Sequence, residues 1–283
     1  MMDTQEEEPI VPMTQQEERE LRRVFERLCD FHKKMRLAQA IEPRVERMDE
    51  LKKKYTVYEE PEPEDVWKME EKTPEQLERE REARGRLEIP EGPERAEWAT
   101  LSAEVEQHRA ELAALERPPA GAPEQKIRPA DLLEAARFLG RPATRKDVQD
   151  VIWEVDENLD GAVDWEEFRL MFERNVGDRT GLEPAQLYHM AQFMMYDARN
   201  TGRVTVDQTM SMLYARYGKA KMEAKLKILF GRDMKESGTE GGAITFQQYL
   251  MAVQKTQLET FLATSLGKKI AKKLGDAETL MKK

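Results

Sequence analysis

The segment from 156 to 167 constrains the fold of this chain more than any other. Within twelve residues it carries oxygen-bearing side chains at positions 1, 3, 5, 9 and 12 and a glycine at position 6. A calcium ion takes six to eight oxygen ligands at about 2.3–2.6 Å, and this spacing can supply them from one loop. The predicted calcium ligands are the side chains of Asp156, Asn158, Asp160, Asp164 and Glu167 and the main-chain carbonyl of Ala162.

Both sides of this loop have the apolar spacing of amphipathic helices. An acidic surface turn would not need an apolar helix face on each side. The segment therefore predicts a helix–loop–helix unit, with Val163 placed to form a short β-bridge to a second loop. The flanking apolar residues are Val148, Val151, Ile152 and Val155 before the loop and Phe168, Met171 and Phe172 after it.

Residues from about 110 to 255 resemble the calmodulin and troponin-C superfamily of EF-hand proteins. The resemblance implies an all-α fold with paired EF-hands in two calmodulin-like lobes, preceded here by long coiled-coil-like helices. In a first hand, Ile127 takes the bridging place and Asp131 stands where the closing glutamate would be. The loop before Ile127 has almost no usable ligands, so this hand is expected to persist as scaffold. Its entering helix would be the last part of the Trp98–Leu115 helix.

A third and a fourth hand are expected to bind no metal. In the loop at 197–208, Arg199 stands where a carboxylate should be and Gln208 replaces the closing glutamate. In the fourth hand, Gln248 again replaces that glutamate. Because hands occur in couples, we expect two lobes joined by residues 175–187. The bridging couples would be Ile127 with Val163 and Val204 with Ile244.

The region before residue 120 has two helical stripes of the kind that coiled coils use. The first is expected to end near Pro43, because proline breaks a helix interior, and to resume up to residue 55. His108 in the second stripe is interpreted as a packing residue. The stripes are Leu21, Val24, Leu28, Phe31, Met35 and Ala38, and then Trp98, Leu101, Val105, His108, Leu112 and Leu115.

These patterns predict six segments. They are an acidic flexible leader (1–13), a coiled-coil-like helix (14–55), an acidic proline-containing linker with a charged helix (56–92), an N-terminal EF-hand lobe (93–174), a C-terminal EF-hand lobe (188–255) and a basic amphipathic tail (256–283).

Composition narrows the function classes. The net charge of −10 and the lack of a recognised motif argue against nucleic-acid binding. No apolar run approaches the 18 residues of a transmembrane helix, and the acidic start predicts no secretory signal peptide. A single cysteine, Cys29, excludes an internal disulfide framework and fits a reducing compartment. The three histidines have no nucleophile partner in a catalytic motif, so we expect no enzyme.

The sequence leaves more than one function open. One interpretation is a calcium-binding adaptor or structural protein of a cytoskeletal assembly. The alternatives are a calcium-independent scaffold and a soluble calmodulin-like sensor whose methionines line a groove for a target helix. One intact hand, decayed hands and long charged helices are similar to EF-hand proteins of ciliary and flagellar axonemes. That resemblance implies tubulin or other axonemal proteins as partners, and a cytoplasmic, cytoskeletal location in a cilium or flagellum.

Overall fold

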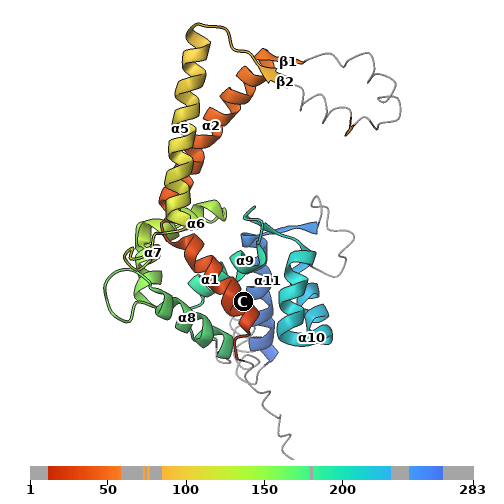
Figure 1. The fold of residues 1–283 in the computed structure, drawn as a ribbon. Coiled ribbons are helices and arrows are strands. Elements are labelled where there is room, and N and C mark those ends of the chain that lie inside the picture. The colour runs from red at the N-terminus through yellow and green to blue at the C-terminus, as the bar shows by residue number, and fades with distance from the viewer. Residues whose placement is uncertain are drawn as a thin grey trace, which may run out of the picture. The chain divides into compact units, whose positions relative to one another are not determined.

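A computed structural model describes residues 12–58, 73, 75–76, 85–178, 181–230 and 242–263, and the described part is mostly helical (Figure 1). The chain forms two compact units. One combines residues 1–32 with 123–283, and the other is the intervening segment 33–122. Most of the predicted leader and acidic linker, and the tail beyond residue 263, lie outside the described residues.

The first unit contains seven of the described helices and one small sheet. Its helices are α1 (Gln15–Leu28), α6 (Pro129–Phe138), α7 (Arg145–Trp153), α8 (Trp165–Gly177), α9 (Gln186–Tyr196), α10 (Val206–Phe230) and α11 (Phe246–Ala263). The sheet pairs β3 (Arg203–Val204) with β4 (Ile244–Thr245) in antiparallel register.

The β-pairs couple the hands as the sequence predicts. Ile127 and Val163 form an isolated antiparallel bridge, with N–H to carbonyl distances of 2.8 and 2.9 Å. Val204 pairs with Ile244. All four of these side chains are buried. Both predicted couples are confirmed, whereas the division of the hands into two lobes stays a prediction.

Helix α1 is tied to several elements of the first unit. It begins at a capping box, in which Thr14 and Glu17 each accept a hydrogen bond from the other's main-chain amide. Phe25 packs its ring 5.5 Å from that of Trp165 and 5.6 Å from that of Phe168, both on α8. At the other end of α1, Glu17 pairs with Arg216 of α10 at 2.6 Å, and each side chain is only 8% exposed.

The helix predicted over 14–55 is divided at Cys29 and Asp30. Cys29 is buried with extended backbone (ψ 128°), and Asp30 has a φ of 54°, so the chain turns before α2 (Phe31–Tyr55). The expected end near Pro43 is wrong, because α2 runs through it. Pro43 lies on the exposed side of α2, and ion pairs from the following turn hold the helix to a neighbour.

The second unit is a helical hairpin made by α2 and α5 (Pro93–Glu116), with β1 (Thr56–Tyr58) paired to β2 (Gly85–Leu87). Three ion pairs show that the helices run antiparallel: Arg44–Glu104 at 2.5 Å, Arg47–Glu97 at 2.8 Å and Lys54–Glu94 at 2.8 Å. Val105 of the predicted stripe is 3% exposed, and the other five stripe residues of α5 are half-buried.

No helix among the described residues has a stretch both long and apolar enough to cross a membrane.

Candidate metal site

The second hand consists of α7, the loop 156–167 and α8. Helix α7 begins at a capping box between Thr144 and Asp147. The hydrogen bond that the Thr144 main-chain amide donates to Asp147 lowers the pKa of this carboxyl below its ordinary value. Helix α8 begins at the N-cap Asp164, whose side chain accepts the amide of Glu167 at 3.0 Å. These two caps fix the residues at which α7 and α8 begin, and the loop 156–167 joins the two helices.

The first residue of the loop organises its turn. Asp156, 7% exposed, accepts the amide of Asp160 at 3.2 Å and that of Gly161 at 2.8 Å. Gly161 has a φ of 82°, a conformation that glycine adopts readily. Asn158 accepts the amide of Asp160 at 3.0 Å, and Asp160 in turn accepts that of Ala162 at 3.0 Å. The predicted ligands therefore line one continuous turn.

Glu167 closes the loop from the opposite side. Its Oε1 accepts the amides of Glu157 and Asn158 at 3.0 and 3.2 Å, and its Oε2 accepts that of Asp164 at 2.9 Å. The side chain is 7% exposed. Both carboxylate oxygens thus already face the loop, from the position that a bidentate calcium ligand takes.

A basic side chain of the chain itself reaches the loop. The Lys126 ammonium hydrogen-bonds to Asp160 and lies 3.9 Å from an oxygen of Asp164. This contact raises the pKa of Lys126 and lowers that of Asp160. Among the described residues, no three acidic, histidine or cysteine side chains converge on one metal position. The loop carboxylates are instead engaged with main-chain amides and with Lys126.

The donor set nevertheless fits calcium. Asp156 and Glu167 are nearly buried carboxylates that accept hydrogen bonds from main-chain amides, which leaves two negative charges for a cation to neutralise. The other predicted ligands lie in the same turn, and rotation of their side chains could bring their oxygens to one ion. A bound calcium ion would draw these oxygens together and supply two positive charges.

The first hand has its closing residue in place without a ligand set. Asp131 is fully buried and accepts the Arg128 amide at 3.0 Å, as Glu167 accepts that of Asp164. Its other oxygen accepts the main-chain amide of His32 at 3.2 Å and lies 2.7 Å from the His32 ring nitrogen. His32 thus contacts the second oxygen of this closing carboxylate through both its main-chain amide and its ring.

The predicted entering helix of the first hand is wrong. Helix α5 belongs to the second unit, whereas α1 packs against α6 and α8 and so occupies the place of that helix. The chain between His32 and Pro123 is therefore inserted within the first hand's loop. The sequence does contain a signal for this role of α1, which the prediction missed. With Cys29 taken as position 1 of the first loop, apolar residues lie 8, 5, 4 and 1 residues before position 1 in both the first and the second loop. These residues are Leu21, Val24, Phe25 and Leu28 before Cys29, and Val148, Val151, Ile152 and Val155 before Asp156.

The third loop repeats the turn of the second. Asp197, fully buried, accepts the amides of Thr201 and Gly202 at 2.9 and 2.7 Å. Gln208 accepts the Thr205 amide at 2.8 Å, and in the fourth hand Gln248 does the same to Thr245 at 2.9 Å. That neither hand binds metal stays a prediction.

Arg27 of α1 interacts electrostatically with Asp197 of the third loop. Burial lowers the pKa of this arginine to about 10, against the opposing effect of Asp197. A guanidinium at that pKa is still charged at neutral pH. The third loop therefore has a cationic neighbour supplied by α1.

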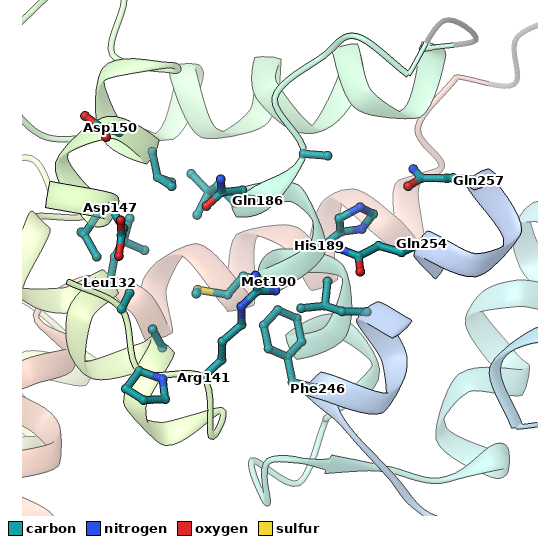
Figure 2. A pocket seen from close by; sticks show the side chains of 18 residues that line it. Leu132, Arg141, Asp147, Asp150, Gln186, His189, Met190, Phe246, Gln254 and Gln257 are labelled. Atoms are coloured by element: carbon teal, nitrogen blue, oxygen red, sulfur yellow. The ribbon is translucent and has the colours of Figure 1, made fainter. Parts of the chain in front are cut away.

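A cavity of about 620 Å³ lies in the first unit, with α6 and α7 on one side and α9 and α11 on the other. Figure 2 shows Met190, Arg141 and Phe246 extending toward its centre. Its wall includes His189, whose pKa burial lowers to about 4. Other methionines of this region, among them Met194 and Met195, are buried core residues. Met190 is the one methionine among the described residues that line this cavity, and a methionine groove for a target helix stays a prediction.

Comparison with known families places one part of the chain. Residues 123–175 match the model of an EF-hand domain pair, and this range contains Ile127, Val163 and the whole loop 156–167. No curated protein matches the chain significantly. The match covers only part of the chain. It supports the interpretation that this is an EF-hand protein and suggests that the protein binds calcium.

Proposed function

We propose that this chain binds one calcium ion in the loop 156–167. The ligands would be the side chains of Asp156, Asn158, Asp160, Asp164 and Glu167 and the carbonyl of Ala162. The observation that carries the proposal is the closing carboxylate of Glu167, which is nearly buried and directs both oxygens into the loop. The other three hands lack a glutamate at this place.

We further propose that the protein is an adaptor or structural component of a cytoskeletal assembly. Support comes from the second unit, a hairpin of charged helices held by ion pairs between α2 and α5. Among the described residues of 33–122 the buried apolar side chains are Leu51 and Val105, so this hairpin encloses little core. An axonemal location, with tubulin or another axonemal protein as partner, rests on resemblance alone. Co-sedimentation with microtubules tests it, and a chain that stays in the supernatant would contradict tubulin as the partner.

A second candidate is a soluble sensor that binds a target helix. The observation that favours it is the cavity beside Met190, whose wall is apolar at Leu132, Val148 and Leu250. This apolar part of the wall, beside an adaptable methionine, suits a helix that presents apolar anchors, and the charged side chains of Arg141 and Asp147 line the same cavity.

A calcium titration of the full chain tests the metal site. Trp165 is the reporter, because its ring lies beside Phe25 and 4.7 Å from the Arg22 guanidinium, so it senses a change between α8 and α1. We expect binding heat and a change in Trp165 emission, and we expect the calcium affinity obtained from both to fall by roughly 100-fold in Glu167→Gln. The variant Trp153→Phe should keep the emission change, since Trp153 is 73% exposed. Calcium binding that survives Glu167→Gln unchanged would contradict the proposed site. A chain that binds no calcium would favour the calcium-independent scaffold.

A further inference from the structure

We propose that Lys126 sets the calcium affinity of the loop 156–167, because its ammonium group is a built-in cation that calcium must displace from Asp160 and Asp164. This inference rests on the proposed function of that loop. It assigns a role to a residue outside the twelve-residue motif.

The position of Lys126 is fixed by the main chain. The next residue, Ile127, is fully buried and exchanges two hydrogen bonds with Val163, at 2.8 and 2.9 Å. Val163 itself lies between the ligand positions Ala162 and Asp164. The β-bridge therefore carries Lys126 to the loop, where its side chain is 24% exposed. This lysine is held beside the loop by the fold, unlike a surface lysine that meets a carboxylate by chance.

The contacts of Lys126 are to two of the five predicted side-chain ligands. Its ammonium donates a hydrogen bond to Asp160 and lies 3.9 Å from Asp164. The contact with Asp160 raises the pKa of Lys126, so the ammonium is charged at neutral pH. Calcium would need the same oxygens, and the lysine charge would repel the ion once both were close. Binding must therefore break the Lys126 contacts and move the ammonium away.

The displaced lysine lies at a junction of the chain. Residue 122 ends the second unit and residue 123 resumes the first, so Lys126 is among the first residues after the inserted segment. Calcium binding would thus change contacts at the point where the inserted segment rejoins the hand pair.

Calorimetric calcium titrations of the full chain test this role in three forms: wild type, Lys126→Met and the control Lys146→Met. Methionine keeps the length of the side chain and removes the charge. Lys146 is an exposed lysine of α7 in the same unit, so its variant makes the same change in net charge. We expect Lys126→Met to bind calcium about fivefold more tightly, with the gain reduced in 0.5 M KCl. The control should stay within about twofold of wild type.

Amine labelling gives a second readout that a general charge effect would not move. Calcium should increase the labelling rate of Lys126, measured by mass spectrometry, and leave that of Lys146 unchanged. Lys126 labelling that does not respond to bound calcium would overturn the inference.

The outcomes separate the two proposals. If wild type and Lys126→Met bind calcium equally, the inference fails and the proposed function stands. If neither binds, the proposed function fails and the inference fails with it. If only Lys126→Met binds, the inference is supported, because the wild-type loop is then blocked by its own lysine, and the proposed function fails for the wild-type chain.

Discussion

The second and third hands have nearly the same loop backbone but opposite metal chemistry in our account. Gly161 and Gly202 have φ values of 82° and 70°. The carboxylate at position 1 accepts the glycine amide at 2.8 Å in one loop and 2.7 Å in the other. The closing side chain accepts the amide at position 9 at 2.9 and 2.8 Å. The loops differ at four of the five predicted side-chain ligand positions. Asn158, Asp160, Asp164 and Glu167 of the second loop correspond to Arg199, Thr201, Thr205 and Gln208 of the third.

This comparison separates what folds the loop from what would bind the ion. The turn is held by side-chain oxygens that accept main-chain amides, and a glutamine oxygen accepts as a glutamate oxygen does. Calcium needs more, because a neutral amide offers one oxygen and no charge where a carboxylate offers two oxygens and a charge. A hand can therefore lose its metal chemistry and keep its place in the fold.

The largest expected effect comes from removing the first carboxylate of each loop. Asp197→Ala should lower the free energy of unfolding by about 2–3 kcal/mol, because two loop amides lose a fully buried acceptor. Asp156→Ala should cost about 1–2 kcal/mol without calcium, since Asp156 is slightly exposed. Urea unfolding in chelator and in calcium measures both.

Only the Asp156 variant should lose the calcium-dependent gain in stability. Asp197→Ala serves as its matched control, with the same substitution in the same kind of turn. If the calcium-dependent gain in stability disappeared in Asp197→Ala, the third hand would also bind metal, and the two loops would not have opposite metal chemistry.

The next effect concerns pH. His189 lies eight residues before Asp197, at the place that Val148 holds before Asp156. Burial lowers its pKa from 6.5 to about 4, so the folded state binds fewer protons than the unfolded state. The stability from the neutral imidazole is complete above pH 6.5 and declines as pH falls toward 4. The decline should reach about 2 kcal/mol at pH 5.

Urea unfolding of wild type and His189→Gln between pH 5 and 7.5 isolates this contribution. The variant should lose that part of the pH dependence, whereas His108→Gln in the second unit should keep it. Identical pH profiles for wild type and His189→Gln would show that this burial does not govern the titration.

The smallest expected effect is a gained site. Arg199→Asp with Gln208→Glu restores carboxylates at positions 3 and 12 of the third loop, whose glycine turn is already formed. We expect a second calcium site roughly tenfold weaker than the first, because Thr201 and Thr205 stand where the second loop has Asp160 and Asp164 and because Arg27 still opposes a cation near Asp197. Calorimetry of the double variant detects it. A second site as tight as the first would show that these two side chains alone separate the loops.

Patterns within short segments predicted the EF-hand loops and their pairing, but they could not predict contacts between residues far apart in the sequence. The loop 156–167 and both bridging couples follow from spacing within short segments, so Val163 and Ile244 could be placed without a structure. The role of α1 could not be predicted in this way, because about one hundred residues separate Leu28 from its partners on α6. A continuous apolar stripe from Leu21 to Met35 also concealed the turn at Asp30. Lys126 was missed because its role depends on the β-bridge and on no loop motif.

Native mass spectrometry counts the calcium ions bound to each chain and so tests whether the loop 156–167 is the calcium site. We expect one ion per wild-type chain, none in Glu167→Gln at the same free calcium, and one in the control Gln208→Ala. Two or more specific ions in the wild type would contradict this expectation, as would a single ion that persists in Glu167→Gln.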